Sequence, residues 1–365
     1  MIYIALVASL PIMAYLCFSK NGILVLDRKQ GLYGENHSYL MLFFILCAIL
    51  IAFRSNLVGV DTIHYSKHFD TVSTLSFSEI RDYSNRYAIE IGYIFLMKLS
   101  SLIIDNYYFF QLIIASLYSL LMYRFFSKNT DNQLFVSVLF LGLGLLLYSF
   151  NIQRQMLAVA IVLESWNAFT DKKYYRTVFW LILASFFHST AVIFLGVLLS
   201  YYFRESKLFL ILSSIVILFV VIRFDFIINL LSHNISKYAN YFKNIKIIQS
   251  AGGVKFIWGG IVLLALLTIF RKIFLQKKEL SNLPTYAILS LGYVVANILG
   301  LHFNYFERLG LYCLPFVAIF LEKFGTSLED KTARSIYYFF TYLFFIIYFL
   351  MSAMGSEQYN YHFYF

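Results

Sequence analysis

Cysteine is scarce in this chain, and the common nucleotide-binding motifs are missing from it. The three cysteines, Cys17, Cys47 and Cys313, each stand alone within an apolar run, which indicates neither a disulfide framework nor a cysteine metal site. The seven histidines and the acidic residues do not fall at metal-ligand spacing either. The sequence contains no Walker loop or dinucleotide fingerprint, so we expect no ATP-driven step by this chain. No metal and no cofactor are predicted.

Charged residues are also few, at 13% of the chain, against 61% apolar and 20% aromatic residues. They stand in the gaps between apolar runs, many of which approach the ~20 residues needed to cross a hydrocarbon core of ~30 Å. A soluble protein does not repeat this pattern in run after run. The sequence therefore predicts an all-α polytopic integral membrane protein with about 11–13 transmembrane or re-entrant helices.

The spans are predicted to form one membrane domain over residues 1–365, because no repeat of about 35–50 residues and no linker divides the chain. They are expected at residues 2–18, 39–56, 88–104, 107–125, 133–150, 153–170, 174–203, 208–222, 254–270, 284–301, 309–323 and 335–353. The run 174–203 is too long for one ordinary crossing, and His188 lies near its middle. We expect two shorter segments that meet at His188.

Lysine and arginine in the short loops predict the orientation of these spans. Five basic stretches are expected on the cytoplasmic side: Lys20 to Lys29, Lys172 to Arg176, Arg204 with Lys207, Arg271 to Lys278, and Lys323 to Arg334. The helix ends at Arg154, His188 and Arg308 then lie outside, as do the loops 57–87 and 223–253. The net charge of +10 suits anionic lipid or an anionic substrate, and it requires no nucleic acid.

Arg124 and Lys128 conflict with this orientation. Both look cytoplasmic, yet two full crossings between residues 88 and 125 would place them outside. The segment 88–104 is short and carries Lys98. We therefore expect one segment near 60–104 to be re-entrant or to lie in the membrane interface.

The two long external loops differ in pattern. Loop 57–87 contains Gly59, Asp61 and Tyr65. In loop 223–253, apolar residues recur at near-helical spacing between 235 and 248 with lysines among them. That pattern predicts an amphipathic helix on the bilayer surface, or else an ordinary capping helix.

Several short motifs follow one another along the chain. They are Arg54 with Gly59-x-Asp61-x3-Tyr65, Glu90-x-Gly92-Tyr93, Arg154-Gln155-x2-Ala158, Phe187-His188-Ser189 and Tyr305-Phe306-x-Arg308. In this order the set resembles the Wzy/EpsG-type family of bacterial polysaccharide polymerases, over nearly the whole chain. The sequence departs from the family pattern at Ile91, where many relatives carry proline, and in a slightly loose spacing from Arg54 to Asp61.

The resemblance implies a GT-C-like fold and an activity on the outer face of the bacterial cytoplasmic (inner) membrane. There, polyprenyl-pyrophosphate-linked oligosaccharide repeat units would be joined into a capsule, exopolysaccharide or O-antigen. The implied enzyme is a membrane glycosyltransferase, and the absence of residues at metal-ligand spacing predicts that it is metal-independent. Its expected partners are the lipid-linked oligosaccharide and membrane lipid, while a chain-length regulator stays open.

Six residues are expected to bind substrate: Arg54, Tyr65, Arg154, Gln155, Tyr305 and Arg308. Guanidinium groups pair bidentately with phosphate oxygens and stay charged at any relevant pH. A charge at the end of an apolar helix is costly unless it snorkels to water or serves chemistry. Snorkelling is the alternative explanation for Arg154, and a salt bridge with Glu307 is the alternative for Arg308.

Asp61, Glu90 and His188 are the candidate catalytic residues, in that order of preference for a general base. The base must reach the acceptor hydroxyl without being paired so tightly that its pKa falls. Structural explanations also exist. Asp61 could form a turn, Glu90 could cap a helix, and His188 could cap a kink.

Two other functions fit the same composition. A lipid-linked glycan flippase or transporter would favour inverted repeats, and no internal repeat is visible. A glycan ligase or a transferase that uses a lipid-phosphate sugar would need the same arginines. Surface glycan of a deletion strain separates these classes, because loss of a polymerase leaves single repeat units.

Overall fold

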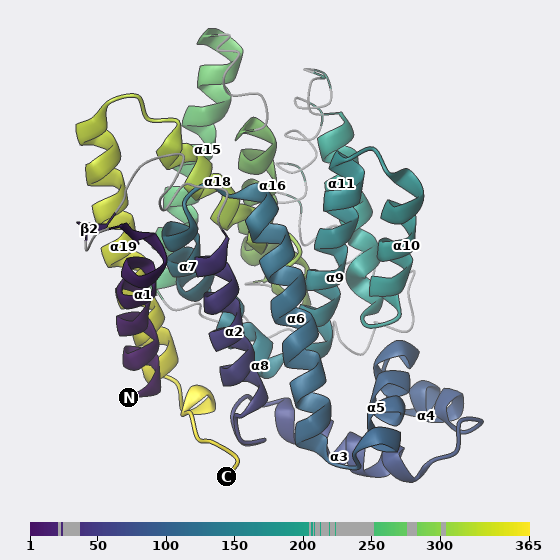
Figure 1. The fold of residues 1–365 in the computed structure, drawn as a ribbon. Helices are drawn as coiled ribbons and strands as arrows, with labels where there is room; N and C mark the ends of the chain where they lie inside the picture. The colour runs from purple at the N-terminus through teal and green to yellow at the C-terminus, as the bar shows by residue number, and fades with distance from the viewer. Residues whose placement is uncertain are drawn as a thin grey trace. The chain divides into compact units, whose positions relative to one another are not determined.

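The computed structural model describes residues 1–20, 23–24, 37–203, 252–275, 283–300 and 304–365, with five single positions between 206 and 223. The regular structure of these residues is helical, apart from a two-residue antiparallel ladder of β1 (Ser19–Lys20) and β2 (Ile23–Leu24). The α-helices are α1 (Ile2–Phe18), α2 (Ser38–Ala52), α3 (Thr62–Thr74), α4 (Ile80–Tyr87), α5 (Ile91–Ile103), α6 (Tyr107–Asn129), α7 (Gln133–Gly142), α8 (Leu145–Asn151), α9 (Gln153–Thr170), α10 (Tyr174–Ser185), α11 (Phe194–Tyr202), α15 (Gly252–Leu275), α16 (Leu283–Gly300), α17 (Asn304–Gly310), α18 (Leu314–Thr326) and α19 (Lys331–Met354) (Figure 1). The predicted all-α fold class is confirmed.

The described residues form two compact units. Unit 1 comprises residues 1–192 and 328–365, and unit 2 comprises residues 193–327. Unit 2 contains α11 and α15 to α18, with α16 packed against α15, α17 and α18. The prediction of a single membrane domain over residues 1–365 stays a prediction.

The centre of unit 1 is α9. Its side chains are buried from Gln155 to Ala168, and it packs between α6 and α10. The helix is therefore buried on nearly all sides, although it carries polar residues such as Glu164 and Asn167. Neighbouring α2, α6 and α7 contribute an aromatic core in which Phe44 lies 6.0 Å from Phe126 and 5.1 Å from Phe140 between ring centroids.

The predicted span 133–150 is a bent pair of helices. α7 and α8 meet at an angle of 45°, and Gly144 at their junction has φ +80°, a conformation that glycine adopts readily. The bend directs the end of α8, at Phe150 and Asn151, toward the turn that begins α9.

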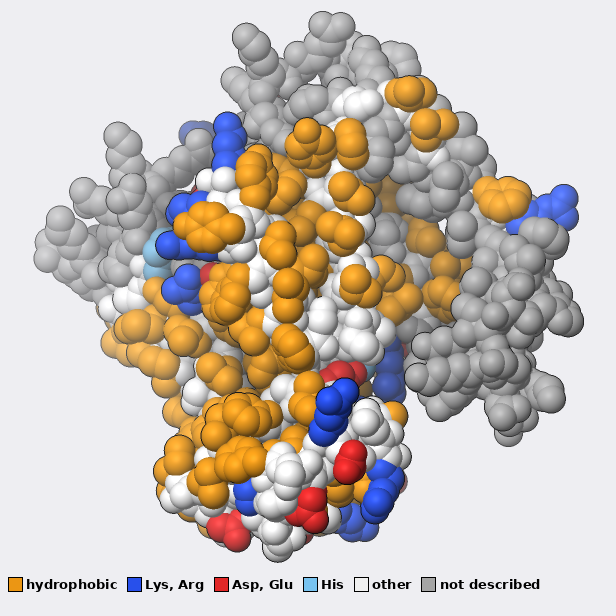
Figure 2. Space-filling view, turned by 90° about the vertical axis from the view of Figure 1, so that its right-hand side faces the viewer, with side chains coloured by type: hydrophobic (Ala, Val, Ile, Leu, Met, Phe, Trp, Pro, Cys, Tyr) orange, Lys and Arg blue, Asp and Glu red, His pale blue; other side chains and the backbone are white. Residues whose placement is uncertain are grey.

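Three described helices are long and apolar enough to cross a membrane, namely α6, α16 and α19, and the bent pair α7–α8 makes a fourth. Shorter apolar helices include α1, α2 and α5. Figure 2 shows a broad hydrophobic surface with charged side chains gathered around α3 to α5. Large apolar side chains such as Val178 and Ile182 on α10 are more than half exposed, which suits contact with lipid. The protein is therefore a polytopic helical membrane protein.

The run 174–203 is divided as the sequence predicts. α10 ends at Ser185, a 3₁₀ turn covers Ser189–Ile193, and α11 begins at Phe194. His188 stands in the break between them. The prediction of two shorter segments that meet at His188 is confirmed.

The segment 57–87, expected as an external loop, folds largely into α3 and α4. α3 buries Tyr65, Phe69 and Val72 at helical spacing, and it packs on α5 and α6. The following α5 has 13 residues, roughly 20 Å of helix, which is shorter than a hydrocarbon core of ~30 Å. Lys98 on α5 donates a hydrogen bond to the Ser73 carbonyl at 2.8 Å. These features agree with a re-entrant or interfacial segment near 60–104, which stays a prediction.

The position of Arg124 and Lys128 follows from their partners. Arg124 pairs with Glu164 near the end of α9, and Lys128 pairs with Asp171 in the turn after it. Both basic residues therefore lie at the same end of unit 1 as the basic turn 172–176. If the short α5 does not cross the membrane, the predicted orientation has no conflict at these residues; the orientation itself stays a prediction. The amphipathic pattern at 235–248 lies outside the described residues.

Candidate active site

A cluster of charged side chains lies where α5 and α9 begin and α10 has just ended. Glu90 precedes α5, Arg154 is in the first turn of α9, and His188 follows α10. Arg154 Nη1 is 2.5 Å from Glu90 Oε2, and His188 Nδ1 is 2.9 Å from Glu90 Oε1. The Ser189 backbone N–H donates to the same Oε1 at 3.1 Å. Three motifs far apart in the sequence thus meet on one carboxylate.

Glu90 does not act as a helix cap. It occupies the N-cap position of α5, but its side chain makes no capping hydrogen bond. Burial alone would raise the pKa of the Glu90 carboxyl, but the hydrogen bond from His188 and the positive charge of Arg154 lower it to about 2. A carboxylate with so low a pKa is a weak base at neutral pH. It is suited to holding Arg154 and His188 in place.

Gly92 allows these elements to approach one another. Its backbone N–H donates to the Phe186 carbonyl at 2.9 Å, and a Cβ atom at position 92 would lie 2.6 Å from that carbonyl oxygen. The spacing Glu90-x-Gly92 therefore sets the start of α5 directly against the residue two positions before His188. This close backbone contact is the reason that Glu90 reaches His188 and Ser189.

Replacement of Gly92 with alanine should destabilise the protein. The new methyl group must displace either α5 or Phe186, and overpacking of this kind costs about 1–3 kcal/mol. Gly196→Ala is the matched control, because nothing lies within 4 Å of a Cβ at that helical position and alanine favours helix there by roughly 0.5–1 kcal/mol. We expect the midpoint temperature of thermal unfolding of the purified protein to fall for Gly92→Ala and not for Gly196→Ala. Equal midpoints would show that this contact does not hold the site together.

The Arg154 guanidinium group also lies against an aromatic ring. The Arg154 guanidinium carbon lies 5.9 Å from the centroid of the Tyr65 ring, a cation–π distance. Tyr65 in turn packs edge-on against Tyr93 at 5.6 Å. Glu90 and Tyr65 together fix the plane of the guanidinium group. Gln155, the next residue on α9, is buried.

Asp61 lies in a turn that is tied to the end of α8. Its backbone N–H donates to Asn151 Oδ1 at 2.9 Å, and the Thr62 hydroxyl donates to the Phe150 carbonyl at 2.7 Å. Gly59 has φ +90°, and a Cβ there would lie 2.2 Å from the Phe150 oxygen. The Asp61 side chain makes no capping hydrogen bond to α3. Its backbone is therefore tied to Asn151, the last residue of α8 and three positions before Arg154 in the sequence, while its carboxylate does not cap α3.

Arg54 is a buried arginine whose partners are backbone carbonyl groups. It is completely buried, and it donates hydrogen bonds to the carbonyls of Ile51 and Phe150. Its guanidinium carbon is also 5.3 Å from the centroid of the Phe150 ring. These contacts join the end of α2 to the end of α8. The structure thus gives Arg54 a positioning contact, whereas a role in substrate binding stays a prediction.

Arg308 and Tyr305 belong to unit 2. Both are in α17, and the Arg308 side chain is exposed. Gly300 at the end of α16 lets α17 pack closely, because a Cβ there would lie 2.8 Å from Glu307 Cβ. The Tyr305 side chain lies outside the described residues. Their predicted roles in substrate binding stay predictions.

Sequence reasoning missed the residues that support the cluster. The C-terminal tail, residues 356–365, braces the segment before Asp61. Ser55 N–H donates to the His362 carbonyl and Gly59 N–H donates to the Gln358 carbonyl, both at 2.8 Å. The tail has no motif that would reveal this role. In contrast, the glycine of Glu90-x-Gly92 was a readable sign of a close backbone approach.

Within the part of the chain that the structure describes, no group of three or more His, Cys, Asp or Glu residues could hold a metal ion. The predicted independence from metal stays a prediction. Chemically, the cluster offers an oriented guanidinium group, an imidazole held through Nδ1, and a nearby turn that carries a carboxylate.

The fold and this cluster define a polytopic membrane protein with a charged site at the ends of its helices. A family model, that of the EpsG family, matches residues 37–364. The chain belongs to the EpsG family, an EpsG/Wzy-type family of polysaccharide polymerases, and this membership supports a polysaccharide polymerase-type function. Comparisons with curated proteins and with solved structures found no match, so the GT-C-like fold stays a prediction.

Proposed function

We propose that this protein joins polyprenyl-pyrophosphate-linked oligosaccharide repeat units into a surface polysaccharide such as capsule, exopolysaccharide or O-antigen. The observation that supports this most is the convergence of Glu90, Arg154 and His188 at one end of a buried helix in a member of the EpsG family. Transfer of a glycan from a pyrophosphate carrier requires stabilisation of the departing pyrophosphate and a base for the acceptor hydroxyl. An oriented arginine side chain such as that of Arg154 would stabilise the departing pyrophosphate.

Arg154 is the proposed pyrophosphate ligand. Glu90 binds one of its terminal nitrogens and Tyr65 lies against the guanidinium group, so the fork is oriented before the substrate arrives. Pre-oriented charge in a site with little water stabilises developing negative charge strongly. Arg308 is proposed as a second phosphate ligand, and Gln155, Tyr65 and Tyr305 as glycan or phosphate contacts.

Asp61 is the proposed general base. Its carboxylate is part of a rigid turn but does not cap the helix that follows. Glu90, with a pKa of about 2, is a much weaker base and is better suited as an anchor. His188 is the second candidate, because its Nδ1 is held by Glu90 and its Nε2 is the nitrogen left for substrate.

The site is proposed to face outward from the cytoplasmic membrane. α9 has 18 residues, roughly 27 Å of helix, with Arg154 at its start and the basic turn at Asp171–Lys173 just after its end. Lys128 from α6 joins that turn, so basic residues collect at the end opposite to Arg154. Such clusters mark the cytoplasmic side of membrane proteins.

Cysteine labelling on intact cells tests this orientation. In a background without the native cysteines, Ser189→Cys should react with a membrane-impermeant maleimide, because Ser189 is exposed beside Glu90. Lys173→Cys, also exposed, should react only after the membrane is permeabilised. Labelling of Lys173→Cys and protection of Ser189→Cys on intact cells would invert the orientation.

The function itself is tested with the purified protein and purified lipid-linked repeat unit. We expect products that carry two or more repeat units on one carrier, with release of the free polyprenyl pyrophosphate. A flippase would move the substrate across a vesicle without changing its length. Transfer of the glycan to a different acceptor, with no increase in repeat number, would instead identify a ligase or a lipid-phosphate-sugar-dependent transferase. A chain-length regulator would alter the product length distribution when added.

A further inference from the structure

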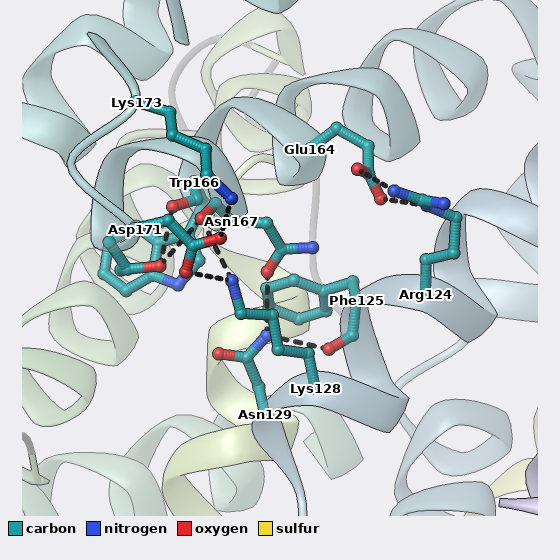
Figure 3. Close-up of polar contacts among 10 residues, drawn as sticks. Arg124, Phe125, Lys128, Asn129, Glu164, Trp166, Asn167, Asp171 and Lys173 are labelled. Atoms are coloured by element: carbon teal, nitrogen blue, oxygen red, sulfur yellow. Dashed lines mark hydrogen bonds and ion pairs between the residues drawn. The ribbon is translucent and has the colours of Figure 1, made fainter. Parts of the chain in front are cut away.

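A second cluster of charged side chains lies at the other end of α9, where α6 ends and α10 is about to begin (Figure 3). Arg124 and Glu164 form a two-point ion pair, with distances of 2.9 and 3.0 Å. In the turn after α9, the Asp171 carboxylate receives Lys128 at 2.5 Å and Lys173 at 3.2 Å. The proposed polymerase reaction uses none of these residues.

This cluster surrounds a cavity of about 560 Å³. Arg176 also lines it, and the aromatic rings of Phe179 and Trp180 form part of its wall. The lining therefore combines basic groups, hydrogen-bonding groups and aromatic surface. A cavity of this size accommodates a phosphate-containing headgroup.

The charges in the lining do not balance. Four basic side chains face two carboxylates, Glu164 and Asp171. The hydrogen bond from Lys128 lowers the pKa of Asp171, so this carboxylate is ionised at neutral pH. It therefore contributes a full negative charge to the balance of the lining. Arg176 has no ion pair with any described residue, and its guanidinium carbon lies 5.8 Å from the centroid of the Tyr175 ring. An excess of two positive charges remains at the cavity, which favours an anionic ligand.

Apolar surface continues from the cavity along α10. Val178, Phe179 and Ile182 are between 54% and 57% exposed, and they follow one another at helical spacing on the helix that starts at the cavity. Lys128 lies in the last turn of α6, a helix long enough to span the membrane. The cavity is therefore at the level where lipid headgroups meet hydrocarbon. A ligand with an anionic head and hydrocarbon tails matches both surfaces.

We propose that this cavity binds the phosphate headgroup of an anionic membrane phospholipid, with its acyl chains along α10. Arg176 and Lys173 supply charge to the phosphate, and Trp180 packs at the depth where indole rings favour the membrane interface. Basic pockets at helix ends attract anionic lipid from the adjacent leaflet. The site is separate from the polymerase site, at the opposite end of α9.

Binding is measured by native mass spectrometry of the full-length protein in a neutral detergent. Dihexanoyl-phosphatidylglycerol is titrated against dihexanoyl-phosphatidylcholine, which has a phosphate but no net charge. We expect a bound phosphatidylglycerol at several-fold lower concentration than phosphatidylcholine. Arg176→Gln and Lys173→Gln should each weaken this binding by about fivefold, the effect of one basic residue near an anionic lipid surface.

Lys172→Asn is the matched control. It removes a positive charge next to Lys173 but outside the cavity lining, and asparagine tolerates the positive φ of +60° at that position. It should bind phosphatidylglycerol like the wild type. Thermal unfolding of all three variants confirms that they are folded, which the exposure of these side chains favours.

Three results would overturn the proposal. Equal binding of the two lipids would show that the excess charge plays no part. Unchanged phosphatidylglycerol binding in both Arg176→Gln and Lys173→Gln would place the lipid elsewhere. Binding of glycerol phosphate or inorganic phosphate as tight as that of phosphatidylglycerol would assign the cavity to a soluble anion. All three are read without polymerase activity, so they are independent of the proposed function.

Discussion

Arg154→Lys is expected to lower the rate of polymerisation by about 100-fold or more, the effect of removing one oriented electrostatic donor from an active site. The variant keeps a positive charge but loses the planar fork. In the wild type, one terminal nitrogen of Arg154 is bound by Glu90 at 2.5 Å, and a guanidinium group has further N–H donors in fixed directions. A lysine at this position has one compact ammonium group. Once Glu90 binds it, little remains for pyrophosphate.

The measurement is the initial rate of chain extension by purified enzyme, with expression and thermal unfolding checked in parallel. Arg86→Lys is the matched control, because Arg86 is an exposed residue in the last turn of α4, outside the cluster. It should polymerise at the wild-type rate. If Arg154→Lys also extends chains normally, Arg154 only snorkels to water, and the pyrophosphate ligand must be sought at Arg308.

The geometry explains why the charge alone is not sufficient. Glu90 accepts hydrogen bonds from Arg154 and from the Ser189 N–H and lies 2.9 Å from His188 Nδ1, so three groups share its negative charge. In the lysine variant the single ammonium group has to satisfy this partly buried carboxylate, because an unsatisfied carboxylate there is costly. Arg154 therefore has two partners to satisfy, and only a guanidinium group has enough donors in fixed directions for both.

Much of the fold could be read from the sequence because membrane helices impose strong constraints. Apolar runs have to reach a fixed length, and a polar triplet such as His188-Ser189-Thr190 cannot continue inside one, which is why the break at His188 was predictable. The buried spacing of Tyr65, Phe69 and Val72 on α3 was also visible in the sequence. It was overlooked because 57–87 carries enough charge to resemble an ordinary loop.

The site was predictable as a set of residues but not as an arrangement. Glu90 and Ser189 are 99 positions apart, and no local pattern indicates that they meet. Their contact depends on the backbone of Gly92 lying against Phe186, which is a property of packing. The same holds for Arg54, because a buried arginine with carbonyl partners and one that binds phosphate look identical in sequence. The tail at 356–365 gave no sequence signal of its contacts with Ser55 and Gly59.

Asp61→Asn is expected to abolish chain extension, with a loss of about 100-fold to 10,000-fold, the usual contribution of a general base. Asparagine keeps the size and polarity of the side chain but cannot accept a proton at neutral pH. The turn should survive, because it is held by the Asp61 backbone N–H on Asn151 and by Thr62 on Phe150, and not by the carboxylate. Lipid-linked substrate should therefore bind as it does to the wild type.

The control for this change is Asp70→Asn, which neutralises an exposed carboxylate on the same helix α3 and should extend chains at the wild-type rate. The assay measures product length and substrate binding separately. If Asp61 is the base that acts on the acceptor, its loss must shorten the products and leave substrate binding unchanged. A change in both would indicate instead that Asp61 contacts the substrate.

His188 is the alternative candidate for the general base. Glu90 holds its Nδ1 at 2.9 Å, so a carboxylate and an imidazole stand in the order found where a histidine acts as a base. If Asp61 is the base, His188→Gln should keep partial activity, since glutamine still donates a hydrogen bond, and His188→Ala should lose more. If Asp61→Asn extends chains normally while His188→Gln is inactive, the base is His188, oriented by Glu90. Asp61 would then belong to a turn that only covers the site, and the low pKa of Glu90 would be part of catalysis because an ionised carboxylate stabilises the imidazolium that forms.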